Sequence, residues 1–227
     1  MPTPKSGYRL KDGTRVPGTT TIIGRFKDSG GLIHWSWEQG RDGLDYRVTR
    51  DSAADAGTLG HWLVEQHIAG LAENEITAAF QQKTKTEKIE KEIADKAIKA
   101  YQSYRLWEKQ TNLKIVAQEM LLVSETHKFG GTPDAVGEID GQLCLVDWKT
   151  GNALYRDHLV QVAAYAQLWN ENNPDRLITG GFHICRFSKA HGDFAHHYYD
   201  ELDDAWQQFL LFRKAYDLDK LLKKRAA

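Results

Sequence analysis

Two aspartates and a lysine lie at the ends of one short segment, and their spacing could support metal-dependent chemistry. Asp134 follows a proline, and Asp147 stands two residues before Lys149. The residues between the aspartates form two strand-like runs joined by Asp140-Gly141, a pair favoured in two-residue type I′ turns. With that turn, residue 139 faces 142, 137 faces 144 and 134 faces 147. The pattern therefore predicts a β-hairpin that sets the two aspartates directly opposite each other.

Facing carboxylates need a partner of opposite charge. Opposed side chains in an antiparallel pair have Cβ atoms roughly 4.5–5.5 Å apart, and like charges at that separation are destabilising. A divalent cation would neutralise them, and an all-oxygen site with open positions suits Mg²⁺ or Mn²⁺ better than Zn²⁺. Lys149 should project from the same face as the aspartates, whereas Trp148 should point to the other face. A cation beside an ammonium group is suited to phosphodiester hydrolysis, in which water attacks a phosphorus atom.

The same residues resemble a known family signature. Pro133-Asp134, followed by Asp147-Trp148-Lys149, is similar to the motif of the PD-(D/E)xK nucleases. Three further segments are similar to motifs of the RecB-like branch of that family, in the same order along the chain: Gly57-Thr58-Leu59-Gly60-His61 with Glu65, then Glu119, then Gln161 with Tyr165. The resemblance implies a restriction-endonuclease-like core.

The resemblance also implies a set of metal ligands. Asp134, Asp147 and the main-chain carbonyl of Trp148 would hold the catalytic metal, and His61 would reach it from a helix. Family members that carry an iron–sulphur cluster use four cysteines. Because this chain has two cysteines, we expect no such cluster.

The remaining matching residues would act around that metal. Lys149 would orient or activate the attacking water. Glu119 would help to place a metal or would pair with a basic group. Gln161 and Tyr165, together with Thr58, would support the site or contact the nucleic-acid backbone.

Several of these residues also have ordinary structural interpretations. A lone helical histidine such as His61 is often a half-buried polar residue, and a tyrosine one turn after a glutamine is often packing with its hydroxyl hydrogen-bonded. The apolar stripe of Tyr101, Tyr104 and Trp107 could stack on unpaired bases, but core packing accounts for it as well. The same two interpretations apply to the tryptophans of segment 35–37.

The composition is that of an ordinary globular protein. The chain has 227 residues, with 30 Lys and Arg against 31 Asp and Glu, so its net charge is −1. A nucleic-acid partner must therefore be held by a local basic patch or by bound cations. Mean hydropathy is −0.56, and without an apolar run near the ~20 residues that span a bilayer we expect no membrane association. The absence of a visible signal peptide and the few cysteines favour an intracellular protein, cytoplasmic in a bacterium or phage-infected cell.

The hydrophobic pattern indicates the elements that position these residues. We expect one domain over residues 1–227, in which 1–45 form an extension made of a hairpin and short helices. The predicted fold class is mixed α/β, with a central mixed sheet flanked by helices. Helices are predicted at 45–71, 86–110, 156–172 and 202–224, and strands at 114–124, 131–139, 142–148, 177–187 and 193–199.

These observations lead us to expect a Mg²⁺- or Mn²⁺-dependent deoxyribonuclease. The family resemblance implies an exonuclease in DNA end processing, recombination, repair or replication. Its substrate would be single-stranded DNA or duplex ends, and a recombination or replication protein is a candidate partner. Three alternatives stay open: a non-catalytic nucleic-acid-binding module with a nuclease-like fold, a structure-specific endonuclease, and a metal-independent small-molecule or structural protein in which the motif occurs by chance. The sequence leaves polarity, strand preference and the number of metals undetermined.

Overall fold

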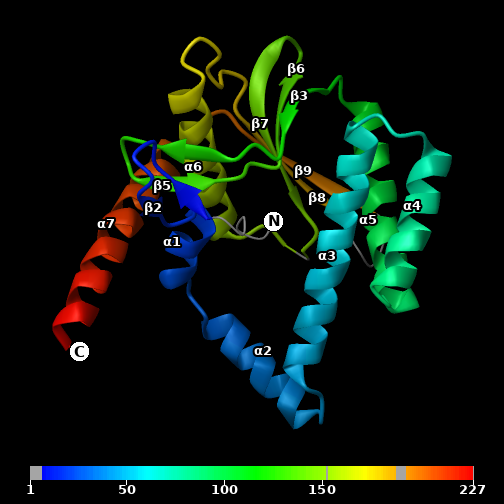
Figure 1. Cartoon of the computed structure of the whole chain (residues 1–227). Coiled ribbons are helices and arrows are strands. Elements are labelled where there is room, and N and C mark those ends of the chain that lie inside the picture. Colours follow the sequence, from blue (N-terminus) through cyan, green and yellow to red (C-terminus); the bar gives the residue numbers. More distant parts are fainter. Residues whose placement is uncertain (1–6, 152, 188–192, 227) are drawn as a thin grey trace.

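A mixed β-sheet forms the centre of the molecule (Figure 1). The computed structural model describes residues 7–151, 153–187 and 193–226. Within these residues the central sheet has five strands in the order β3, β6, β7, β8, β9, with bounds Lys114–Gln118, Ala135–Ile139, Gln142–Lys149, Phe182–Phe187 and Phe194–Tyr199. β7 and β8 are parallel, and the other neighbouring pairs are antiparallel.

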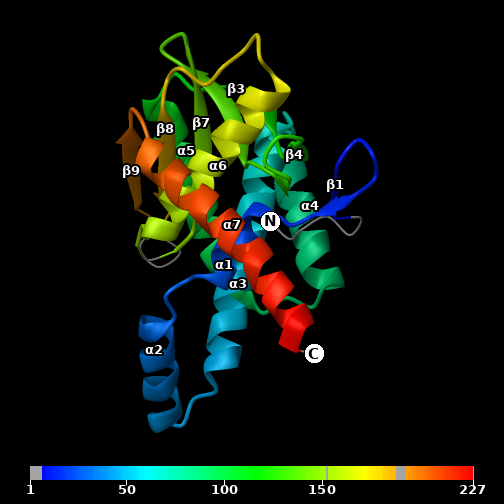
Figure 2. The same cartoon turned by 90° about the vertical axis from the view of Figure 1, so that its left-hand side faces the viewer.

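Helices cover both faces of this sheet (Figures 1 and 2). One face carries α3 (Tyr46–Ile68), α4 (Glu73–Thr86) and α5 (Lys91–Gln110). The other carries α1 (Thr19–Arg25), α6 (Arg156–Asn172) and α7 (Asp203–Ala226). The predicted fold class, a mixed sheet flanked by helices, is therefore confirmed.

The central strand β7 contributes to the hydrophobic cores on both faces. Val146 and Trp148 pack towards α5, while Leu145 packs towards α6. A strand that is buried on both faces reads as a nearly continuous apolar run, and segment 143–148 has that character. Asp147 is the exception in this run, since it places a carboxylate in the interior.

Helix α5 supplies large buried side chains to one core. Tyr104 and Trp107 are almost fully buried, and their rings lie 5.3 Å and 5.6 Å from the ring of Trp148, measured between centroids. The core-packing interpretation of this aromatic stripe is therefore correct.

The hairpin formed by β6 and β7 has the predicted register. Ile139 pairs with Gln142, and Gly137 pairs with Cys144. The turn residues Asp140 and Gly141 have φ values of 51° and 79°, as a type I′ turn requires. The predicted alignment of positions 134 and 147 continues this register by one step beyond the last ladder pair.

One of the predicted strands is interrupted and two begin later than predicted. The strand predicted at 114–124 breaks at Glu119, whose φ of 51° no strand can accommodate. It forms β3 and a separate β4 (Leu122–Ser124), which pairs with β5 (Phe129–Gly131) in a small second sheet. The strand predicted from 131 begins only at Ala135, and the strand predicted from 177 begins at Phe182.

The helical prediction was also incomplete. Helix α4, over residues 73–86, was not predicted, because its apolar face shows only two buried residues, Ile76 and Phe80. The helix predicted from 86 begins at Lys91, since Lys88 has a φ of 54° and separates α4 from α5.

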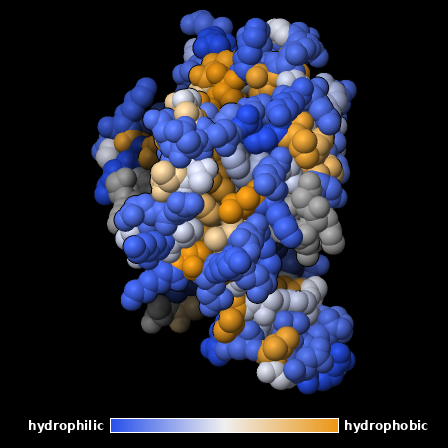
Figure 3. All heavy atoms as spheres, turned by 90° about the vertical axis from the view of Figure 1, so that its right-hand side faces the viewer, coloured by the Kyte–Doolittle hydropathy of each residue, from blue (hydrophilic) through white to orange (hydrophobic). Residues whose placement is uncertain are grey.

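The N-terminal segment forms a hairpin and an exposed helical arm. Strands β1 (Tyr8–Arg9) and β2 (Arg15–Val16) pair as predicted. Helix α2 (Gly30–Arg41) has no buried residue and projects with the start of α3 away from the sheet (Figures 1 and 2). Hydrophobic residues are scattered on that part of the surface (Figure 3). Trp37 on α2 is exposed rather than packed in a core.

No helix among the described residues combines the length and apolarity needed to cross a membrane.

Candidate active site

The two aspartates lie at the open end of the β6–β7 hairpin, opposite its turn. Asp147 belongs to β7 and Asp134 directly precedes β6. Both are buried: relative exposure is 1% for Asp147 and 7% for Asp134. The backbone N–H of Trp148 donates a 2.8 Å hydrogen bond to Asp134 Oδ2. This bond ties the two strands together at the point where ladder pairing ends.

Lys149 connects the aspartates to helix α6. Its ammonium forms an ion pair with Asp147 and donates a 3.2 Å hydrogen bond to Gln161 Oε1. Gln161 Nε2 in turn donates a 3.0 Å hydrogen bond to the hydroxyl of the buried Tyr165. Because Tyr165 holds the amide nitrogen, the amide oxygen of Gln161 is turned towards the lysine. The Gln-x-x-x-Tyr motif thus orients the ammonium group.

Glu119 joins the site through its unusual backbone conformation. Its N–H donates a 3.1 Å hydrogen bond to the main-chain oxygen of Asp134, which fixes the end of β3 beside the aspartate. Burial raises the pKa of Glu119 to about 8, and the negative charges of Asp134 and Glu65 contribute to the increase. The carboxyl group therefore lies near the other acids.

The whole group of acids has raised pKa values. Burial raises the pKa of Asp147 to about 6, although the charge of Lys149 opposes the increase. Burial also raises the pKa of Asp134, and burial together with the charge of Asp134 raises that of Glu65. Carboxylates that are desolvated and mutually repelling in this way bind either protons or a cation.

Helix α3 brings His61 to the same place. His61 Nδ1 lies 3.9 Å from Asp134 Oδ2, and burial lowers the pKa of the imidazole to about 4. The ring also interacts with the main chain of Trp148. At neutral pH the histidine is therefore uncharged, which is the form that binds metals.

The residues present fit a divalent cation. Among the residues that the structure describes, neither carboxylate oxygen of Asp147 has a hydrogen-bond donor apart from the ion pair with Lys149, and Glu65 Oε1 is buried without a partner. Unpaired buried carboxylate oxygens are the donors that Mg²⁺ and Mn²⁺ prefer. Across the described ranges, however, no three His, Cys, Asp or Glu side chains already stand in a metal-ligating arrangement.

Thr58 precedes His61 by three residues on α3, and its role in supporting the site or contacting nucleic acid stays a prediction. It lies on the exposed side of α3, and its hydroxyl donates a 3.1 Å hydrogen bond to the main-chain oxygen of Ala54. Its conformation is that of an ordinary threonine on a helix surface.

A basic and aromatic group next to the site was not predicted. Burial, with help from the charges of Lys149 and Lys27, lowers the pKa of His158 on α6 to about 4. The ring of Tyr155 contacts that of His158, and Lys27 lies over the tyrosine ring. Lys27 lies far from the others in the sequence, so no local pattern could have revealed the group.

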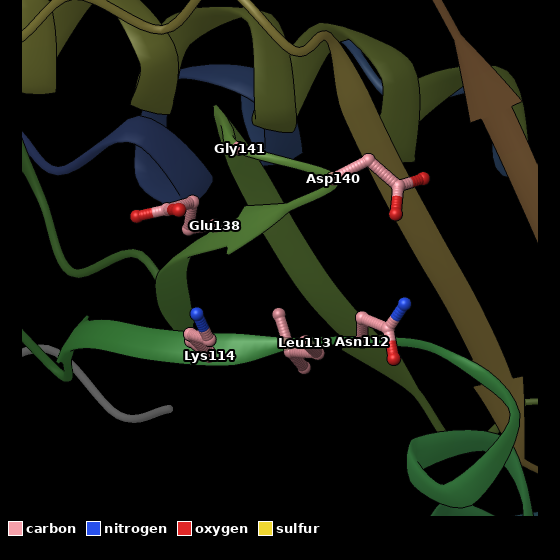
Figure 4. Close-up of a pocket in the computed structure, with 6 residues that line it drawn as sticks. All are labelled: Asn112, Leu113, Lys114, Glu138, Asp140 and Gly141. Carbon is pink, nitrogen blue, oxygen red and sulfur yellow. The ribbon is translucent and has the colours of Figure 1, made fainter.

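A surface pocket lies at the other end of the hairpin (Figure 4). It has a volume of about 560 Å³ and is lined by residues from the start of β3 and the β6–β7 turn, namely Asn112, Leu113, Lys114, Glu138, Asp140 and Gly141. None of the acids with raised pKa lines it, so the candidate chemistry lies elsewhere.

The comparisons with known proteins identify the family. The profile of the PD-(D/E)XK nuclease superfamily matches residues 34–224. This chain therefore belongs to the PD-(D/E)XK nuclease superfamily, and its central mixed sheet flanked by helices is consistent with the restriction-endonuclease-like fold.

The other comparisons add no functional information. Among the solved structures, 21 chains match. One of them, titled "Crystal structure of SSO0001", has a TM-score of 0.38 and 13% identity, over 72% of this chain and 84% of that one. So distant a likeness supports no functional assignment. No curated protein sequence matches significantly.

Proposed function

We propose that this protein is a divalent-cation-dependent DNA exonuclease of the RecB-like branch, acting on DNA ends in recombination, repair or replication. The observation that carries the proposal is the buried pair Asp134 and Asp147 with Lys149 beside them. The branch assignment rests on the order of the further motifs, because His61, Glu119 and the Gln161 pair all lie around these carboxylates.

The chain offers a defined set of ligands for the cation. Asp134 and Asp147 would hold Mg²⁺ or Mn²⁺, with the Trp148 carbonyl and His61 completing the protein ligands. When bound, the cation would polarise the phosphoryl oxygens and acidify water. Glu119, which carries a raised pKa, is placed to share that charge or a proton.

Side chains of the site would assist the hydrolysis step itself. Lys149, held by Gln161, is placed to orient the attacking water and to stabilise negative charge on the phosphate. The water oxygen forms a bond to phosphorus in line with the leaving sugar oxygen, the phosphorus–oxygen bond to that sugar breaks, and the proton of the water passes to a nearby base. The leaving oxygen is protonated by solvent.

The binding-module alternative accounts less well for the acids. A protein that only holds DNA gains nothing from two buried carboxylates near phosphate, because they repel the ligand and cost stability. A structure-specific endonuclease would use the same acids and differs only in where it cuts.

The decisive experiment measures cleavage of end-labelled single-stranded, duplex and circular DNA with Mg²⁺, Mn²⁺ or EDTA. We expect cleavage that requires the cation, spares circles and disappears in Asp147→Asn. Cutting of circles would favour the endonuclease instead.

A matched control lies on the same hairpin. Asp140→Asn makes the same chemical change at the turn, where Asn-Gly is also a favoured type I′ pair, and should leave cleavage unchanged. Cleavage that survives in Asp147→Asn would disprove the assignment of the site. A folded protein that binds DNA but cleaves none of these substrates would favour the binding module.

A further inference from the structure

Tyr155 presents an exposed aromatic ring at the start of the helix that carries Gln161. It directly precedes α6, and its side chain is 54% exposed. An edge-to-face contact with His158 holds the ring, with 5.5 Å between centroids, and the backbone N–H of Tyr155 donates a 3.2 Å hydrogen bond to His158 Nδ1. The ring is thus fixed in place, yet much of its surface is open to a ligand.

A cation lies over the same ring. The ammonium of Lys27, in the segment between α1 and α2, is 5.9 Å from the centroid of the Tyr155 ring. It also pairs with Asp157 at 3.4 Å. The lysine side chain is nevertheless 52% exposed, so its ammonium can contact an incoming anion.

One face of α6 and the charge of Lys149, which acts on His158, connect this group to the catalytic site. His158 and Gln161 are three residues apart on α6 and therefore share a face of the helix. Gln161 accepts the hydrogen bond from Lys149, which pairs with Asp147. A nucleotide that lies on Tyr155 would therefore adjoin the phosphate held at the carboxylates.

We propose that Tyr155 and Lys27 form a nucleotide-binding subsite, in which the tyrosine ring stacks on an unpaired base of the cleaved strand and the lysine contacts a phosphate of that nucleotide. Aromatic rings with adjacent cations hold single strands in this way without reading sequence. A base inside a duplex has both faces covered by its neighbours and cannot offer one to the ring. The subsite, which rests on the proposed nuclease function, therefore implies a preference for single strands or frayed ends.

The first test measures binding of a fluorescent single-stranded oligonucleotide, with every variant made in the Asp147→Asn background to prevent cleavage. Tyr155→Ala should weaken binding about tenfold, as expected for the loss of one stacked base. Tyr155→Phe keeps the ring and should bind within about twofold of the parent. Tyr198 is a matched control, because it is 55% exposed and contacts a histidine ring on the opposite face of the sheet; Tyr198→Ala should bind normally.

The second test removes the base rather than the ring. A series of oligonucleotides carries a single abasic nucleotide at successive positions. At one position, the abasic nucleotide should weaken binding by the Asp147→Asn parent, which keeps Tyr155, about tenfold. At that position it should not weaken binding by Tyr155→Ala further. Equal losses for both proteins at every position, or unchanged binding by Tyr155→Ala, would overturn the stacking proposal. The abasic series with Tyr155 present gives an answer even if a substitution disturbs folding.

The third test concerns the lysine. Lys27→Gln should lower the slope of log affinity against log salt concentration by about 0.7, the value for one phosphate contact on a single strand. An unchanged slope would remove Lys27 from the subsite. These outcomes are separate from the nuclease assignment, since metal-dependent cleavage that disappears in Asp147→Asn would stand even if all three subsite tests failed.

Discussion

At the scale of single residues, the site is a concentration of buried negative charge. Asp147 lies in the central strand of the sheet and has Lys149 as its ion-pair partner. Asp134, Glu65 and Glu119 surround it, and each has a raised pKa. Burying mutually repelling carboxyl groups costs folding free energy. Such a cost is typical of a functional site whose charge is completed by a ligand.

The raised pKa of Glu119 predicts how stability depends on pH when no cation is present. Its folded pKa of about 8 exceeds the ordinary value of 4.5, so between those values the native state binds a proton that the unfolded state has lost. Stability should therefore fall as pH rises from about 5 to 8, by at most about 1 kcal/mol per pH unit after allowance for solvent screening. Urea denaturation in EDTA should show a flatter dependence for Glu119→Gln, and identical slopes would contradict the assignment.

Lys149 predicts a division between turnover and binding. Because its ammonium contacts Asp147 and is oriented by Gln161, Lys149→Ala should lower kcat by roughly 10²- to 10⁴-fold, the range for loss of a positioned proton-transfer group. Affinity for DNA should change less than about tenfold. Single-turnover kinetics with a parallel binding assay separates the two quantities. Equal losses in both would make Lys149 a phosphate anchor.

At the scale of elements, close packing around β5 holds the segment that leads into Asp134. A Cβ atom on Gly130 would lie 2.3 Å from the ring of Tyr8, and one on Gly131 would lie 2.6 Å from the ring of Tyr165. The hydroxyls of Tyr8 and Thr132 share a 3.1 Å hydrogen bond. The N-terminal hairpin and α6 therefore fix this segment from two sides.

Gly131→Ala should be strongly destabilising. Its Cβ would also meet Leu168 and Thr19, each at 2.8 Å, so α1 and α6 would both have to move. We expect a loss of about 1–3 kcal/mol, the usual cost of overpacking, measured by thermal or urea unfolding. Gly40→Ala is the control: a Cβ at this position in helix α2 would meet no atom of another element within 4 Å, so stability should be unchanged or rise by up to about 1 kcal/mol. Equal stability of the two variants would contradict the packing described here.

At the scale of the whole molecule, the site joins the two layers of helices through the sheet. His61 comes from α3 on one side and Gln161 from α6 on the other, while Asp147 lies on the strand between them. A cation bound here would connect elements that are distant in sequence. Its binding should therefore stabilise the fold as a unit.

This arrangement predicts a cation-dependent melting temperature. Ligand binding to the folded state at a hundred times Kd contributes about 2.7 kcal/mol, and each kcal/mol raises Tm by roughly 2–4 °C in a chain of this size. We expect Mn²⁺ to raise Tm by about 5–10 °C over EDTA, and Asp147→Asn to abolish the increase. The same Tm in Mn²⁺ and EDTA would contradict a cation site at these residues.

Short-range sequence patterns were sufficient to predict the local features of the fold, above all the β6–β7 hairpin. The Asp140-Gly141 turn and the alternation along each strand are properties of neighbouring residues, and they predicted the β6–β7 register that aligns positions 134 and 147. The fold class followed from the succession of strong periodic segments. The family signature could also be identified from the sequence, because it consists of particular residue types at fixed spacing, namely Asp134, Asp147 and Lys149.

The surroundings of that hairpin depend on tertiary packing. The break at Glu119 requires a positive φ that the sequence pattern does not reveal, and α4 has too few buried residues to show a clear stripe. His61 comes close to Asp134 because of the way α3 packs against the sheet. Lys27 comes close to Tyr155 because of the position of the segment after α1. Contacts between residues far apart in the chain arise from the burial of whole faces, and for that reason no local pattern could specify them.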